Sequence, residues 1–104
     1  MLSILIPTYD YDISSLVEEI HTQLAKTDYV FEILCLDDHS NDQETIKQNE
    51  RINTFSNAVY KVLPENIGRS RIRNLLAQKA QYDWLLFLDA DVIPVKKDFI
   101  TKYV

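Results

Sequence analysis

The sequence contains a single glycine, Gly68, in 104 residues. One glycine excludes the glycine-rich turns that hold phosphate in dinucleotide-binding and P-loop proteins, because both motifs need several glycines at fixed spacing. There is also one cysteine, Cys35, so no disulfide can form within the chain and no Cys/His zinc pattern exists. Since Cys35 lies in an apolar run, we expect a small buried residue there.

Basic charge is scarce as well, with 11 Lys and Arg against 16 Asp and Glu and a formal net charge of −5. Nucleic acid is therefore not an expected partner, because binding its backbone needs a basic surface. No apolar run approaches the ~20 residues that cross a bilayer, and no signal peptide precedes the first run. We expect a cytoplasmic domain, and contact of a longer protein with the inner face of a membrane remains open.

Apolar residues make up 46% of the chain, which predicts one folded domain. Short apolar runs that read as strands alternate with segments of helical periodicity. The runs cover residues 2–6, 30–36, 58–63 and 84–88, and the helical segments cover 13–24, 42–53 and about 70–80. This order predicts an α/β fold: a three-layer, doubly wound, mainly parallel sheet of about four strands with helices on both faces.

Two helix starts carry capping signals. Ser15 and Glu18 have the spacing of a capping box. Asn41 and Asp42 precede the weak, polar segment and are predicted to be helix caps rather than ligands. The third helix is predicted to follow Ser70, and its apolar face consists of Ile72, Leu75, Leu76 and Ala80.

Each predicted strand ends in a polar cluster. In open α/β sheets, ligands bind beyond the carboxyl ends of the strands, so all four clusters are expected along one edge. The clusters are Thr8-Tyr9-Asp10, Asp37-Asp38, Glu65-Asn66 with Gly68, and Asp89 with Asp91.

Asp89 and Asp91 stand two residues apart at the end of the last strand. Two such carboxylates can offer one or two oxygen ligands to Mg²⁺ or Mn²⁺, and substrate phosphate and water complete the octahedron. The alternative is a turn whose aspartate caps the next helix. Because Val92-Ile93-Pro94 is no helix start, the pattern favours a metal site.

Asp37 and Asp38 are neighbours at a strand end, so their side chains point to opposite faces. One can accept hydrogen bonds from a base or ribose while the other holds a loop; loop capping by both is the alternative. Tyr9 offers a flat ring for stacking on a nucleobase, and the alternative is a core or surface tyrosine.

Three arginines, Arg69, Arg71 and Arg73, surround the start of the third helix, whose N-terminus favours anions. Helical spacing places Arg69 and Arg73 near one side and Arg71 on another, so at most two act together. They can contact phosphate or the acidic loops, and solvated surface is the alternative for each. His21 is expected to face solvent and His39 to lie in a loop, and neither is given a chemical role.

Together, four segments resemble family 2 glycosyltransferases of the GT-A fold. They cover residues 4–9, 33–42, 65–74 and 84–91, in the family's order and spacing. The resemblance implies that Tyr9 lies against the base, that Asp38 meets the base or ribose, and that Arg73 lies near the phosphates. Asp91 would be the direct metal ligand, and Asp89 would approach the ribose or the metal's water shell. The implied nucleotide-binding set is Pro7, Thr8, Tyr9, Asp38, Asn66, Gly68, Arg73 and Asp89.

The family transfers a sugar from a nucleoside diphosphate, commonly UDP, to an acceptor, and for this chain the resemblance points to inversion. The acceptor is expected to be a glycan or a lipid-linked molecule, and a divalent metal would offset charge on the leaving diphosphate. Residues 1–104 are interpreted as the N-terminal nucleotide-sugar-binding portion of a longer enzyme. The general base is expected outside this chain, so no catalytic residue is assigned. The chain alone is predicted to lack turnover, and a bare sheet edge could let it form a homo-oligomer.

A non-catalytic nucleotide-binding or interaction module of the same fold is the main alternative, and binding that needs neither metal nor Asp91 would favour it. A phosphohydrolase is disfavoured, because its aspartate pair usually follows the first strand, whereas Asp89 and Asp91 follow the fourth.

Overall fold

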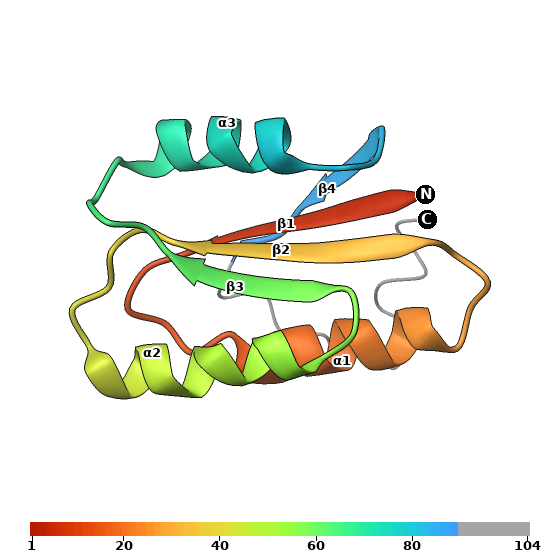
Figure 1. Cartoon of the computed structure of the whole chain (residues 1–104), viewed down its shortest axis with the longest axis horizontal. Coiled ribbons are helices and arrows are strands. Elements are labelled where there is room, and N and C mark those ends of the chain that lie inside the picture. Colours follow the sequence, from red (N-terminus) through yellow and green to blue (C-terminus); the bar gives the residue numbers. More distant parts are fainter. Residues whose placement is uncertain (90–104) are drawn as a thin grey trace.

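The computed structural model describes residues 1–89, which form a parallel four-stranded sheet between two helical layers (Figure 1). The strands, β1 (Leu2–Thr8), β2 (Phe31–Asp37), β3 (Ala58–Val62) and β4 (Trp84–Phe87), lie in the order β3-β2-β1-β4. Helix α3 (Arg69–Lys79) covers one face. The other face carries α1 (Ser14–Ala25), α2 (Gln43–Asn49) and the 3₁₀ helix η1 (Glu50–Thr54). The predicted three-layer α/β fold is confirmed.

The strand order reverses at β1. The chain builds β2 and β3 outward on one side of β1 and then places β4 on its other side. In register, Thr8 of β1 lies opposite Asp37 of β2, and Leu5 lies opposite Phe87 of β4. Because all pairs are parallel, the strands end at the same edge, and the crevice between β1 and β4 is the topological switch point where such sheets bind ligands.

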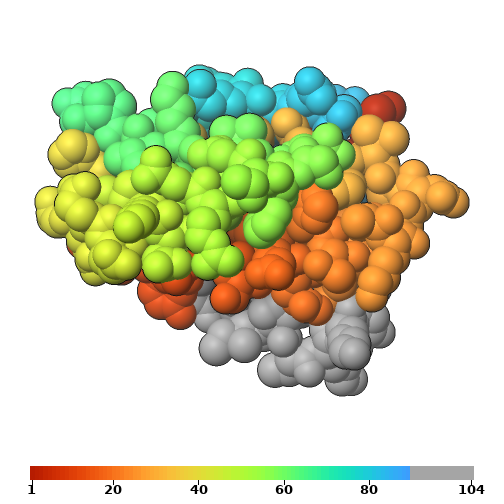
Figure 2. Space-filling view, turned by 60° about the horizontal axis from the view of Figure 1, so that its bottom comes forward, coloured from red at the N-terminus to blue at the C-terminus, as the bar shows by residue number. Residues whose placement is uncertain are grey.

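The core is divided between the two faces of the sheet. Side chains alternate along β1, so Ile4 and Ile6 pack toward α1 while Leu5 packs toward α3. In α3, Ile72 and Leu76 are buried against this second cluster, with Leu75 and Ala80 packed beside them, as predicted. Both faces are apolar, which explains why the strands read as continuous apolar runs. Figure 2 shows how α2, η1 and α1 together cover the first face.

Buried Cys35 belongs to the first cluster and is a free thiol, as expected. Burial raises the pKa of this thiol far above its ordinary value, because the thiolate would lose its solvation. It therefore acts as a small apolar residue.

The predicted capping box of α1 was wrong, although the predicted segment 13–24 lies within one residue of the helix. The helix begins at Ser14, and Ile13 in the N-cap position makes no side-chain cap. Instead, one carboxylate oxygen of Asp12 accepts hydrogen bonds from the Ser14 N–H at 2.9 Å and the Ser14 hydroxyl at 2.6 Å. Because Ser15 is already inside the first turn, it cannot serve as the N-cap of a capping box.

The other two helix starts give a mixed result. Of the two predicted caps, Asp42 is the N-cap of α2, and its carboxylate accepts from the N–H groups of Glu44 and Thr45. Asn41 is not the cap, and its side-chain amide donates to the Tyr9 hydroxyl instead. Helix α3 begins at Arg69, earlier than predicted, because Gly68 occupies the N-cap position. Its φ of 86° and ψ of 163° are open to glycine alone among common residues, which lets the chain turn sharply into the helix.

Strand β4 forms an edge of the described sheet. Trp84 is 69% exposed and Leu85 is 41% exposed along it. Within residues 1–89, no helix is long and apolar enough to span a bilayer.

Candidate functional site

A pocket of about 220 Å³ lies at the carboxyl ends of the strands, at the switch point of the sheet. Its walls come from the ends of β1, β2 and β4 and from the first turn of α3. The lining residues are Pro7, Thr8, Tyr9, Asp38, Arg69, Ile72 and Asp89. The structure thus brings together five residues of the predicted nucleotide-binding set; the lining does not include Asn66, Gly68 or Arg73. Asp91 lies outside the described residues.

The end of β1 supplies the aromatic wall. Tyr9 is 46% exposed, and its hydroxyl accepts a hydrogen bond from the Asn41 side-chain amide at 2.9 Å. Thr8 is buried, and its carbonyl accepts the Asp38 N–H at 2.8 Å, which continues the β1–β2 ladder past the end of β2. The Tyr9 ring is therefore held at its tip while much of its surface stays open.

Asp10 ties the loop after β1 to the loop after β2. Its N–H donates to the Ser40 hydroxyl at 2.7 Å, and its carboxylate accepts the N–H groups of Asn41 at 2.7 Å and Asp42 at 3.0 Å. The left-handed backbone of Asp10, with φ of 48°, is one that short polar side chains tolerate. Sequence reasoning placed Asp10 in a polar cluster but missed this role, because its partners lie about thirty residues away.

Asp37 faces the interior and is fully buried. Its carboxylate accepts from the Ser40 N–H at 2.8 Å, the Ser40 hydroxyl at 2.6 Å and the Tyr60 hydroxyl on β3. Burial, followed by the hydrogen bond and negative charge of Asp37, raises the pKa of the Tyr60 phenol above its ordinary value. Asp37 thus holds Ser40, which in turn holds the loop carrying Asp10.

Asp38 points the other way, toward α3 and the pocket. One carboxylate oxygen accepts the Ile67 N–H at 2.7 Å, and the other accepts the Gly68 N–H at 3.0 Å. Its carbonyl accepts the Asn66 side-chain amide at 3.0 Å. Both acids of the pair therefore hold loops, and Asp38 also lines the pocket, where each oxygen keeps a further acceptor site.

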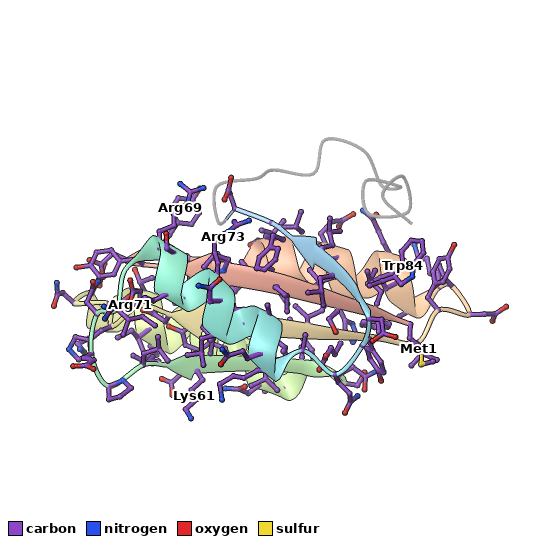
Figure 3. The ribbon with its side chains drawn as sticks, turned by 90° about the horizontal axis from the view of Figure 1, so that it is seen from above. Met1, Lys61, Arg69, Arg71, Arg73 and Trp84 are labelled. Atoms are coloured by element: carbon purple, nitrogen blue, oxygen red, sulfur yellow. The ribbon has the colours of Figure 1, made fainter. Side chains whose placement is uncertain are left out.

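The three arginines of α3 lie in different surroundings. Arg69 lines the pocket, and its Nη2 lies 3.4 Å from the Asp89 carboxylate. The guanidinium of Arg73 lies 4.3 Å from the centre of the Phe87 ring, in cation–π contact. Figure 3 shows Arg69 and Arg73 on one side of α3 and Arg71 on another, as helical spacing predicted.

The two histidines take no part in the pocket lining. His21 was expected to face solvent, but its ring packs against two aromatic rings. It stacks on Phe55 at 5.5 Å between centroids and meets Phe31 edge-on at 5.8 Å. His39 lies in a loop, with Nδ1 3.0 Å from the Leu63 carbonyl.

The described residues offer few metal ligands. Within residues 1–89, no group of three His, Cys, Asp or Glu side chains could hold a metal ion by itself. Asp89, which is exposed at the end of β4, is the described member of the predicted metal pair. One or two carboxylates fit Mg²⁺ or Mn²⁺ when phosphate and water supply the other ligands, so this donor set suits a metal that arrives with a phosphate ligand.

Known proteins are similar to this chain in sequence and in structure. The chain is 33% identical over 94 residues to an uncharacterized glycosyltransferase of Haemophilus influenzae, a match that covers 88% of this chain and 29% of that protein. The structure of Staphylococcus aureus TarS residues 1–349 in complex with UDP-GlcNAc is similar, with 29% identity and a TM-score of 0.69. That match covers 98% of this chain and 29% of the TarS chain.

The fold also matches a mannosyltransferase, PcManGT of Pyrobaculum calidifontis, in complex with GDP-Man and Mn²⁺, with a TM-score of 0.67. Here the identity is 20%, and the match covers 93% of this chain and 29% of the other, so the likeness shows the fold alone. The chain therefore spans less than a third of the length of these relatives. Residues 3–104 match the sequence model of the family "Glycosyl transferase family 2", and the chain belongs to that family.

Proposed function

We propose that this chain is the donor-binding, N-terminal portion of a longer glycosyltransferase and that its pocket binds a nucleoside-diphosphate sugar, with UDP as the expected nucleotide. The observation that carries the proposal is the pocket at the switch point, which combines an open aromatic ring, two carboxylates and an arginine. UDP-GlcNAc bound in the similar TarS structure supports this donor class.

The pocket is suited to one part of such a donor. Pockets that enclose whole small-molecule ligands usually measure about 300–1,000 Å³, whereas this one measures about 220 Å³. We assign it to the base and ribose, with the base against Tyr9 and beside Pro7 and Thr8. The free acceptor sites of Asp38 would meet N–H or hydroxyl groups of the base or ribose.

The diphosphate would then lie toward Asp89 and the first turn of α3, which is the end of the helix that favours anions. Asn66 and Gly68 contribute by holding the loop before α3 against Asp38. Arg73 lies one turn further along the same side of the helix (Figure 3), and the resemblance implies a place for it near the phosphates.

Asp91 is proposed as the direct ligand of Mg²⁺ or Mn²⁺, with Asp89 beside the ribose or the metal's water shell. When bound, the metal would supply positive charge to the leaving diphosphate. An acceptor hydroxyl, from a glycan or a lipid-linked molecule, would bond to the anomeric carbon as the bond from that carbon to the diphosphate breaks, with inversion. The base that takes the hydroxyl proton is expected in the rest of a longer protein.

Calorimetry tests the proposal directly. The folded chain is titrated with UDP, GDP and UDP-sugars, with and without Mn²⁺, and the titrations are repeated with Asp91→Ala. We expect binding of at least one nucleotide that strengthens with Mn²⁺ and a loss of that metal dependence in the variant. Asp28→Ala, a change in an exposed loop remote from the pocket, is the control and should bind normally.

No metal-dependent binding to any of these nucleotides would contradict the proposal. Nucleotide binding that ignores both Mn²⁺ and Asp91→Ala would favour the alternative, a non-catalytic nucleotide-binding module. Sugar transfer by the purified 104-residue chain would contradict the expectation that the chain alone lacks turnover.

A further inference from the structure

We propose that Arg69 binds the diphosphate of the donor. In the absence of donor Arg69 pairs with Asp89, and this ion pair breaks when the donor binds. This inference rests on the proposed function and adds to it a residue to which the resemblance assigned no role. It concerns the exchange of one ion pair for another at the mouth of the pocket.

Among residues 1–89, Arg69 is the one basic residue that lines the pocket. Its side chain is 76% exposed, so the guanidinium is free to reorient toward a ligand. It also stands at the first residue of α3, next to Gly68, which provides no side-chain cap to the helix start. A diphosphate placed there would meet the guanidinium and the helix N-terminus together.

Its two neighbours are placed differently. The Arg73 guanidinium lies over the Phe87 ring at 4.3 Å, and a turn toward the pocket would give up that contact. Arg71 is exposed and projects from another side of α3 (Figure 3). Of the three, Arg69 alone lines the pocket, so it can reach a phosphate at the mouth of the pocket without leaving a packed position.

The contact with Asp89 is suited to exchange. The two groups are 3.4 Å apart and are 76% and 57% exposed, and such exposed ion pairs contribute little to stability. A diphosphate carries more charge than one carboxylate and can accept two parallel N–H bonds from a guanidinium. Binding of the donor would therefore draw Arg69 away and leave the Asp89 carboxylate open on the pocket side, where the resemblance expects it to act.

The first experiment separates phosphate binding from base binding. Arg69→Ala, Arg69→Lys and Arg71→Ala are titrated with UDP and uridine, and with GDP and guanosine, in the presence of Mn²⁺. Loss of a charge-assisted contact should weaken diphosphate binding by about tenfold or more in Arg69→Ala and less in Arg69→Lys. Nucleoside binding should be unchanged. Arg71→Ala is the matched control and should leave both affinities unchanged.

The second experiment tests the exchange itself, without metal. In EDTA, Asp89→Asn should raise the affinity for the diphosphate by about two- to fivefold, because Arg69 no longer has to leave a carboxylate. When Asp89→Asn is introduced into Arg69→Ala, the gain in affinity over Arg69→Ala alone should be smaller. In that background the change removes only the repulsion between Asp89 and phosphate. An equal gain in both backgrounds would overturn the exchange.

The outcomes distinguish the two proposals. If the folded wild-type chain binds no nucleoside diphosphate, the proposed function fails and takes the role of Arg69 with it. If the wild type binds and Arg69→Ala binds as well as Arg71→Ala, the role of Arg69 fails and the proposed function stands. Circular dichroism of each variant confirms that a lost affinity is not a lost fold.

Discussion

At the scale of single residues, the adjacent acids Asp37 and Asp38 do the most to shape the site. Asp37 turns inward to Ser40 and Tyr60, whereas Asp38 turns toward the loop before α3 and the pocket. A buried carboxylate is costly unless donors satisfy it, and each of these two receives at least two. Their hydrogen bonds hold two of the loops that surround the pocket.

Tyr60→Phe tests this support, because it removes one donor from buried Asp37 and leaves the ring in place. We expect the free energy of unfolding to fall by about 1.5–3 kcal/mol, the range for a hydrogen bond to a charged group. Urea denaturation measures the change. Tyr29→Phe, at an exposed position, is the control and should have no effect.

The pH dependence of this variant has a definite sign. The folded state holds the pKa of Tyr60 above its ordinary value, so its hydrogen bond stabilises the fold fully below the unfolded pKa of about 10. Above that pH the unfolded phenol ionises while the folded one keeps its proton, so stability is lost. The difference between wild type and Tyr60→Phe should therefore shrink above about pH 10; a constant difference would contradict this.

At the scale of elements, the strands and helices were predictable in type and order but not in their ends. Strand identity follows from continuous apolar runs such as 30–36, which the register of β2 between β1 and β3 explains. Helix ends depend on which side chain reaches which N–H group. The spacing of Ser15 and Glu18 favoured a cap at Ser15, but the geometry of the loop before α1 brings the Asp12 carboxylate to Ser14 instead.

Asp12→Ala and Ser15→Ala test that selection as a matched pair. Removing the Asp12 carboxylate takes the acceptor from both the N–H and the hydroxyl of Ser14 and should cost about 0.5–2 kcal/mol, as loss of a cap does. Ser15→Ala should change the unfolding free energy by less than about 0.5 kcal/mol, because its position is exposed helix surface. If thermal or urea unfolding ranks the two variants in the opposite order, the result would contradict the Asp12 cap and support the capping box of Ser15 and Glu18.

At the scale of the whole molecule, two separate surfaces lie at opposite ends of the sheet. The pocket occupies the carboxyl ends of the strands, beside Arg69, whereas Met1 and Trp84 lie together at the other end (Figure 3). Met1 is 73% exposed and Trp84 is 69% exposed. Trp84 also starts β4, an edge strand of the sheet that residues 1–89 form. This end therefore combines apolar surface with backbone groups that no described strand pairs, a combination that favours self-association.

Trp84→Lys should therefore reduce self-association of the chain, because a lysine on an edge strand opposes strand pairing. Sedimentation velocity over a range of concentrations measures it, with Val59→Lys on the opposite edge strand, β3, as the control. Nucleotide affinity should be unchanged in Trp84→Lys, because Trp84 pairs with Leu2, at the far end of β1 from the pocket. A wild-type chain that stays monomeric at all concentrations would rule out the association.

The sequence by itself determined the layered α/β fold and the edge at which the polar residues gather. Both follow from local patterns: apolar periodicity defines strands and helices, and parallel strands must end at a common edge. Only the tertiary structure decided which partner each polar residue contacts. Asp37 meets Tyr60, Asp38 meets Ile67 and Gly68, and Arg69 rather than Arg73 reaches the pocket. Those partners lie 20 or more residues apart in the chain, and no local pattern specifies a contact that only the folded sheet creates.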